Sequence, residues 1–317
     1  MTMAQRTDPN TERLAAIDIG SNSIRYMEAE LRASGFGFSR KEVFTTRLAQ
    51  GLSESGMLSP DRMADALDVL KALSRRAADR GFPCRAYATS AVRDAGNRAD
   101  FLRRAQTDAG LAIDVLSGET EADLAFFGAA QSRGGLIDVG GGSTQVVTSA
   151  FCRSFPIGCV RIRDWCDGLP LAEMEKALLP RFSETYVLPP LPGGLWTAVG
   201  GTATTLAALS LGLSEYDPSA LSRAALTGDA LRTLLSALDA MGDAGRRRAP
   251  LLAKRHDVIL GGGLVLLHLM GSIGIEELRF SDADGLEGYA MTLLEGRSLP
   301  AGGEAAPFQK SSQAVLP

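Results

Sequence analysis

The stretch "LIDVGGGSTQVV", residues 136–147, decides the fold of this chain. An apolar run carries the carboxylate of Asp138 and is followed by three glycines and two hydroxyl residues. This order predicts a buried strand that ends in a glycine turn, where backbone N–H groups can approach a phosphate because no side chain intervenes. Taken alone, the stretch fits an ordinary strand and Gly/Ser turn equally well.

A second copy of the pattern lies near the N-terminus, in "AAIDIGSNSIRY", residues 15–26. Asp18 aligns with Asp138, and the residues that follow again combine glycine with hydroxyls. The repetition argues against two chance turns and predicts two domains of like fold. A carboxylate beside a phosphate repels it, so both acids predict a divalent cation between them and the anion, with Mg²⁺ preferred and Mn²⁺ as a substitute.

Two further glycine stretches follow apolar runs. In "AVGGTATTLAAL", residues 198–209, Thr202 is predicted to cap a helix behind Gly200 and Gly201. The stretch "VILGGGLVLL", residues 258–267, is similar but lacks hydroxyls. Residues 258–275 carry no formal charge over nearly the length of a membrane span, yet the three glycines favour a strand, a turn and a buried helix instead.

Composition sets the broad class. The 317 residues can form two domains or one large one, and a net charge of −4 gives no reason to expect a nucleic-acid or membrane partner. The four cysteines lack CxxC spacing and only two histidines occur, so no zinc site is expected. The first residues lack the apolar core of a secretory signal, which predicts a cytoplasmic protein with free thiols. Association as a homodimer is left open.

Alternating strand and helix patterns predict an α/β protein. The clearest helix lies between Ser59, a capping residue, and Gly81, a terminator. After Gly296 the periodicity ends, which predicts a mobile tail without chemistry. Further helices are expected within residues 97–110, 119–131, 202–212, 227–242 and 285–296.

Together the motifs resemble the exopolyphosphatase/guanosine pentaphosphate phosphohydrolase (Ppx/GppA) family, within the superfamily of actin, hexokinase and the heat-shock chaperone ATPases. The resemblance runs from Leu14 to Leu294 in its short, two-domain form. The blocks are "AAIDIGSNSIR", "TRLAQGL", "ATSAVRDAGNRADFL", "VLSGETEADLAFFG", "LIDVGGGST", "SFPIGCVR", "VGGTATTLAAL", "RHDVILGGG" and "LRFSDADGLEGY".

The resemblance implies two ribonuclease-H-like (actin-like ATPase) domains that flank a cleft. The first would comprise residues 1–124 and a C-terminal helix at about 285–297, the second residues 125–284, and the tail residues 298–317. The implied activity is hydrolysis of a phosphoanhydride, releasing terminal orthophosphate from inorganic polyphosphate, guanosine pentaphosphate or both.

The resemblance also assigns roles to residues. By this resemblance Glu121 is the base that activates water, and Arg93 is expected to face the ligand. On residue type alone, Glu119 fits the role of Glu121 equally well. Arg25 is expected only to brace the first loop. The cation is expected at Asp18, Asp138 and, through water, Gln145. Phosphate is expected at Gly20, Ser21, Asn22, Ser23, Gly140, Gly141, Gly142, Ser143, Thr144, Gly201 and Thr202.

Two departures from the family pattern keep other functions open. Gln145 stands where the family usually has glutamate, and Thr120 replaces an acid, so Mg²⁺ binding is expected to be weaker. One alternative is a weak or inactive regulator that binds polyphosphate or guanosine tetra- or pentaphosphate. Another is a small-molecule kinase of the same superfamily. The basic groups at 246–248 and 254–256 fit a polyphosphate track, or, as we prefer, a solvated loop.

Overall fold

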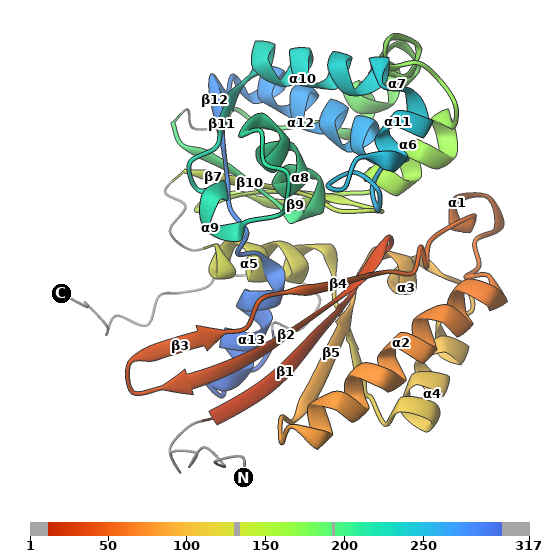
Figure 1. The fold of residues 1–317 in the computed structure, drawn as a ribbon, viewed down its shortest axis with the longest axis vertical. Helices are drawn as coiled ribbons and strands as arrows, with labels where there is room; N and C mark the ends of the chain where they lie inside the picture. The colour runs from red at the N-terminus through yellow and green to blue at the C-terminus, as the bar shows by residue number, and fades with distance from the viewer. Residues whose placement is uncertain (1–11, 130–133, 192–193, 300–317) are drawn as a thin grey trace.

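The computed structural model describes residues 12–129, 134–191 and 194–299. They form two lobes, each built on one sheet, with helix α5 (Gly118–Gly128) between them (Figure 1). The predicted tail falls outside the described residues, apart from its first positions.

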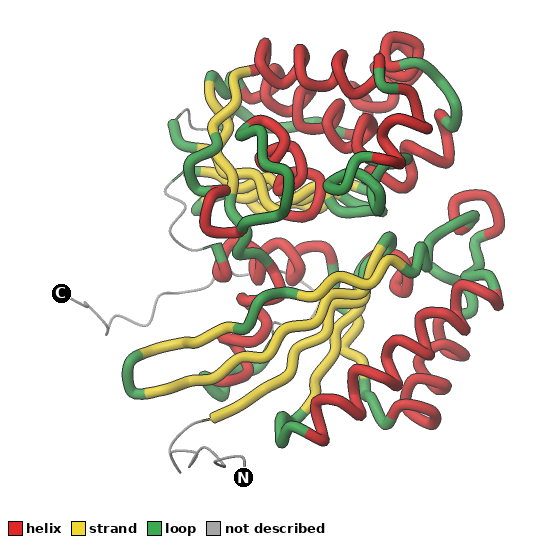
Figure 2. Tube along the Cα trace, viewed as in Figure 1, coloured by secondary structure: helices red, strands yellow, loops and turns green. Residues whose placement is uncertain are grey.

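The first sheet has the strand order β3-β2-β1-β5-β6, and β4 also pairs with β2. β1 and β2 are antiparallel, whereas β1, β5 and β6 are parallel. The end of β1 is an unbroken buried run because helices cover both faces of the sheet (Figure 2). The strands are β1 (Glu12–Ile19), β2 (Ser23–Arg32), β3 (Gly35–Phe38), β4 (Glu42–Thr45), β5 (Cys84–Ala88) and β6 (Ile113–Val115).

The second sheet repeats this plan with the order β9-β8-β7-β10-β12 and adds β11 at its edge. β7, β8 and β9 are antiparallel, and β7, β10 and β12 are parallel. The two matching sheets confirm the predicted pair of ribonuclease-H-like domains. The strands are β7 (Gly135–Val139), β8 (Thr144–Thr148), β9 (Cys152–Phe155), β10 (Trp196–Val199), β11 (Ala225–Thr227) and β12 (Glu277–Phe280).

Helices α2 (Pro60–Asp79) and α4 (Arg98–Ala109) cover one face of the first sheet (Figure 1). Ser59 caps α2 by accepting a hydrogen bond from the Arg62 N–H, and Gly81 beyond its end has a φ of 75°, so the predicted signals are confirmed. Short helices α1 (Leu52–Ser55) and α3 (Ser90–Asp94) lie near the cleft. The second lobe contains α6 (Cys159–Cys166), α7 (Leu171–Thr185), α8 (Gly200–Ser210), α9 (Pro218–Leu221), α10 (Gly228–Ala240), α11 (Gly242–Arg248) and α12 (Ile259–Ile273).

Helix α13 (Gly285–Leu294) follows β12 of the second lobe but packs on the first sheet, where Leu286 and Tyr289 join a buried cluster with Leu14. It also lies against α5, which contacts both lobes. Gly128 and Gly288 make this approach possible, because a Cβ at either position would overlap backbone of the other helix. The boundary expected between the first and the second domain, after residue 124, lies inside α5.

The buried helix predicted within residues 258–275 is confirmed, but the strand and the glycine turn predicted before it are wrong. These residues contain no strand and no glycine turn, because Ile259–Ile273 is one helix, α12, with Gly261, Gly262 and Gly263 buried inside it. Those glycines face Ile162, Thr202 and Leu235, so the missing side chains let three helices pack closely on α12. No helix in the described part of the chain is long and apolar enough to cross a bilayer. The four cysteines are free.

Candidate active site

A cavity of about 70 Å³ lies between the lobes, where β1, β7 and β10 end. It is much smaller than sites for drug-sized ligands, and its size suits a group such as a terminal phosphoryl. Its lining residues are Asp18, Gly20, Ser21, Asn22, Ser23, Arg25, Thr89, Ser90, Glu121, Asp138, Val139, Gly140, Gly141, Ser143, Cys159, Gly200, Gly201 and Arg255.

The two glycine loops have the same backbone turn. The Gly20 N–H donates to the Ser23 carbonyl at 3.1 Å, and the Gly140 N–H donates to the Ser143 carbonyl at 2.9 Å. The loops also touch across the cleft, since a Cβ on Gly141 would lie 2.5 Å from the Cβ of Ser21. The repeated sequence therefore forms two facing loops that bound one cavity.

Not every predicted phosphate-binding residue reaches the cavity. Gly142 lies beside it, against Ser90. The Thr144 hydroxyl instead donates to the Ile157 carbonyl inside the second lobe. Thr202 does not cap α8, because that helix begins at Gly200 and the Thr202 hydroxyl is buried against α12. The other eight predicted positions line the cavity: Gly20, Ser21, Asn22, Ser23, Gly140, Gly141, Ser143 and Gly201.

Asp18 is held by Arg25, its antiparallel partner on β2. The Arg25 Nε donates to Asp18 Oδ2 at 2.8 Å, and the same guanidinium pairs with Asp284, the residue that caps α13. Arg25 therefore braces the first loop, as predicted, and ties it to the segment that joins the lobes. Burial raises the pKa of Asp18 in spite of this partner.

Asp138 lies at the end of β7, directly opposite Gln145 on β8. Burial, followed by the nearby Asp284 and Asp18, raises the pKa of Asp138 to about 7. Gly200 has a φ of 83°, and a Cβ there would lie 2.5 Å from Asp138 Oδ1. Gln145 is fully buried, with its Nε2 donating to the Ser143 and Ser154 hydroxyls.

The oxygen donors of this cavity fit a hard divalent cation. Asp18 Oδ1 and Gln145 Oε1 are buried and accept no hydrogen bond from the described residues. Burial raises the pKa of both carboxyl groups, so a cation bound beside them would favour their charged forms. Among the described residues no three acidic, histidine or cysteine side chains form a ready-made metal cage. Mg²⁺ suits such a site, since it binds through one or two carboxylates together with water and substrate phosphate.

Glu121 lines the cavity from the first turn of α5, whereas Glu119 is exposed on the other side of that turn. Burial raises the pKa of Glu121 to about 8, against the effect of Arg93, whose Nη1 lies 3.7 Å from Glu121 Oε2. Arg93 also donates to the Leu116 carbonyl at 3.0 Å and lies outside the lining of the cavity. Of the two glutamates, Glu121 is therefore the one that lines the cavity. Arg93 contacts Glu121 from outside the cavity lining.

Sequence reasoning missed several lining residues of the cavity, among them Thr89, Ser90 and the charged Arg255. The Arg255 guanidinium lies against Gly201, at the start of α8, where a Cβ would overlap it. Within the described part of the chain it makes no side-chain hydrogen bond or ion pair, and burial lowers its pKa. The sequence signal for Arg255 is the "RHD" directly before an apolar run, but the glycines of that run predict a strand and a turn, which hides its place at the start of a helix.

The preferred interpretation of the basic groups at 246–248 and 254–256 is confirmed in part, because Arg247, Arg248 and Lys254 are exposed to solvent, whereas Arg246 and His256 are buried and Arg255 lines the cavity. Arg246 is buried, and its Nε donates to the His256 carbonyl at 2.9 Å. Arg247 pairs with Asp243, and Arg255 points into the cavity. Arg246 therefore belongs to the packed interior of the second lobe, whereas Arg255 belongs to the cleft.

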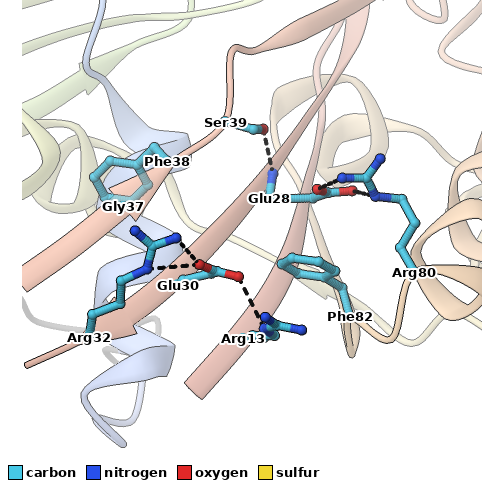
Figure 3. A pocket seen from close by; sticks show the side chains of 9 residues that line it. All are labelled: Arg13, Glu28, Glu30, Arg32, Gly37, Phe38, Ser39, Arg80 and Phe82. Atoms are coloured by element: carbon cyan, nitrogen blue, oxygen red, sulfur yellow. Dashed lines mark hydrogen bonds and ion pairs between the residues drawn. The ribbon is translucent and has the colours of Figure 1, made fainter. Parts of the chain in front are cut away.

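A larger cavity of about 530 Å³ lies at the opposite end of the first sheet (Figure 3). Its acids are already paired, Glu30 with Arg13 and Arg32, and Glu28 with Arg80. It therefore offers no unpaired carboxylate to a ligand or metal, and the small cleft between the glycine loops is the stronger candidate.

Comparison with known proteins agrees with this geometry. Residues 29–295 match the model of the Ppx/GppA phosphatase family. The chain is 32% identical to Exopolyphosphatase 2 of Mycobacterium tuberculosis, over 89% of this chain and 98% of that one. The crystal structure of the Aquifex aeolicus member of the Ppx/GppA family superposes with a TM-score of 0.73 and 28% identity, covering 91% of this chain and 100% of that one. An exopolyphosphatase from Cytophaga hutchinsonii shares the fold, with a TM-score of 0.74, 21% identity and coverage of 92% and 100%.

Proposed function

The chain belongs to the Ppx/GppA phosphatase family, and we propose that it hydrolyses the terminal phosphoanhydride bond of inorganic polyphosphate and releases orthophosphate. The observation that carries this proposal is the position of Glu121. Its buried carboxyl group faces a phosphoryl-sized cavity between two glycine loops.

In this proposal Glu121 is the general base. A water molecule in line with the terminal phosphorus attacks it, its proton passes to the Glu121 carboxylate, and the bond to the bridging oxygen breaks. The electron pair of that bond stays with the shortened chain. Because the pKa of Glu121 is raised to about 8, its basic form becomes more populated as the pH rises toward 8.

In this proposal the glycine loops and the cations would stabilise the negative charge of the phosphate chain. Backbone N–H groups after Gly20 and Gly140 would grip phosphate oxygens, and Arg255 would neutralise part of their charge. Asp18 and Asp138, with Gln145 behind them, are the residues that would hold Mg²⁺. When bound, that ion would offset negative charge on the phosphoryl oxygens. Arg93 would act through Glu121 rather than on the substrate.

The test is phosphate release from long-chain polyphosphate by the wild-type protein and by Glu121→Gln, with Mg²⁺. We expect release by the wild type and a loss of about 10²- to 10⁴-fold in kcat for the variant, with little change in KM. Glu119→Gln is the matched control, since Glu119 is exposed on the same helical turn. Equal losses in both variants would reject the assignment of Glu121.

Guanosine pentaphosphate is the second substrate to test, because loops that grip an anhydride chain do not require a particular group beyond it. A protein that binds guanosine tetraphosphate but releases no phosphate from either substrate would instead be a binding regulator. Phosphate transfer that depends on an added hydroxyl acceptor would indicate a kinase.

A further inference from the structure

Arg47 has an unusual backbone at the edge of the cleft. Among the described residues it is the one non-glycine residue with a left-handed φ, 52°. Such a conformation is costly for a residue with a Cβ and persists where the surroundings fix it, often at functional sites. Arg47 belongs to the first lobe, in the segment after β4.

The backbone around Arg47 supports the first glycine loop. The Arg47 N–H donates to the Asn22 carbonyl at 2.9 Å, and the Ala49 N–H donates to the Ser21 carbonyl at 3.0 Å. Ser21 and Asn22 both line the cavity. The left-handed turn therefore holds this loop from behind.

The side chain of Arg47 crosses to the second lobe. Its Nη2 lies 3.4 Å from Asp257 Oδ2 and 3.3 Å from His256 Nε2. The other ring nitrogen of His256 lies 2.6 Å from Asp243 Oδ1, which assigns its proton to Nδ1 and leaves Nε2 to accept from Arg47. Asp257 is also held by Arg163 at 3.3 Å.

The two acceptors of Arg47, His256 and Asp257, directly follow Arg255 in the chain, and Arg255 lines the cavity. Next to them, Val258 is buried in the apolar cluster of the first lobe, together with Ala49 and Leu52. The segments 47–52 and 255–258 thus form one joint across the cleft, polar at Arg47 and apolar at Val258. Closing this joint sets the position of Arg255 relative to the Ser21–Asn22 loop.

We propose that Arg47 is a positioning residue that clasps the two lobes and thereby brings Arg255 and the first glycine loop into register for the terminal phosphoryl group. It acts through Asp257 and His256 and does not touch the substrate. The catalytic part of this inference rests on the proposed function, whereas the clasp itself does not.

The experiment compares Arg47→Ala, Arg47→Gly, Arg47→Lys, Asp257→Asn and the Arg47→Ala/Asp257→Asn double variant. Steady-state hydrolysis of polyphosphate gives kcat/KM, and small-angle X-ray scattering of the substrate-free protein gives the radius of gyration. Thermal melting ranks the stability of the variants. Arg232→Ala is the matched control, because that arginine forms an exposed pair with Glu175 on the outside of the second lobe.

We expect Arg47→Ala to lower kcat/KM about five- to tenfold and to increase the radius of gyration, with Arg47→Lys intermediate. The loss in the double variant should be smaller than the product of the two single losses, because both changes break the Arg47–Asp257 pair, although Asp257→Asn also weakens the pair with Arg163. Arg47→Gly should match Arg47→Ala in activity but melt at a higher temperature, since glycine accepts the left-handed φ without strain. Arg232→Ala should change neither kcat/KM nor the radius of gyration.

Losses that multiply fully in the double variant would show that Arg47 does not act through Asp257 and would overturn the inference. So would an unchanged scattering profile for Arg47→Ala. If the wild type hydrolyses no polyphosphate, the proposed function fails, yet the scattering profiles and the order of melting temperatures still decide whether Arg47 clasps the lobes.

Discussion

The burial that suits Glu121 to the proposed role of general base also lowers the stability of the folded protein. Its folded pKa of about 8 lies above the ordinary 4.5 because burial penalises the charged form. Between these two values the unfolded chain has released the proton while the folded protein retains it. The stability of the folded state therefore falls as the pH rises from about 4.5 to about 8, and then levels off.

Replacing Glu121 by glutamine removes this dependence. In metal-free buffer we expect Glu121→Gln to match the wild type near pH 4.5 and to exceed its free energy of unfolding at pH 8.5 by about 4–5 kcal/mol. Urea unfolding at several pH values measures the difference, and the exposed Glu119→Gln serves as the control. If the difference in the free energy of unfolding between Glu121→Gln and the wild type did not grow with pH, Glu121 would not be a buried group that retains its proton.

Gln145 offers a second test within the same cavity. Its buried Oε1 has no hydrogen-bond partner among the residues that the structure describes, and Gln145 lies opposite Asp138 in the sheet. Gln145→Glu adds a charge there, so we expect the variant to be less stable than the wild type without metal and to need less Mg²⁺ for half-maximal activity. Melting curves with and without Mg²⁺, together with a Mg²⁺ titration of phosphate release, provide the measurement. A higher Mg²⁺ requirement would place Gln145 away from the cation.

Local sequence predicted the main chain of the site better than its side chains. The acid–glycine–hydroxyl repeat fixes two strands and two turns, and both turns formed as expected. The directions of Thr144 and Thr202 could not be read from the sequence, because each depends on a neighbour distant in the chain, Ile157 and Gly262 respectively. Arg255 was missed for the same reason.

Among the elements, α12 shows where periodicity and glycine content give opposite signals. Three consecutive glycines disfavour a helix, by about 1 kcal/mol each relative to alanine. The helix forms nevertheless, because at these positions it packs against Ile162, Thr202 and Leu235 without intervening side chains. Tertiary packing of this kind is invisible in a single chain segment, which explains why a strand and a turn were expected.

Two alanine substitutions in α12 separate these effects. A Cβ at Gly262 would lie 2.5 Å from the Thr202 Oγ1, whereas at exposed Gly271 it would meet nothing within 4 Å. We expect Gly262→Ala to destabilise the protein by about 1–3 kcal/mol through overpacking, and Gly271→Ala to stabilise it by about 0.5–1 kcal/mol through helix propensity. Chemical denaturation of both variants measures this. If Gly262→Ala were stabilising as well, close helix packing would not explain these glycines.

At the scale of the whole molecule, the two lobes are joined where the chain passes from β12 to α13. The sequence repeat predicted two like domains, but not the charges that hold this crossing together. Lys41, just before β4 in the first lobe, places its Nζ 2.9 Å from Glu287 Oε2 and 3.3 Å from Asp284 Oδ2. Those acids cap α13, and Asp284 also pairs with Arg25. The crossing and the Asp18 loop therefore share one buried ionic network.

Lys41→Met tests this network, because it keeps much of the side-chain length but removes the charge. Two buried carboxylates then lose a cation, so we expect a loss of about 3–5 kcal/mol in the free energy of unfolding. Lys254→Met is the control, since that exposed lysine makes only a 3.4 Å contact with the Val43 carbonyl and should change stability by about 0.5 kcal/mol or less. Adding Glu287→Gln to Lys41→Met should recover part of the loss, because Glu287 then no longer carries a buried charge without its cation, whereas Asp284 keeps its pair with Arg25. Urea unfolding of the three variants decides the matter: a Lys41→Met loss as small as that of Lys254→Met would mean that the crossing is held by the packing of α13 on β1 and α5, and not by these charges.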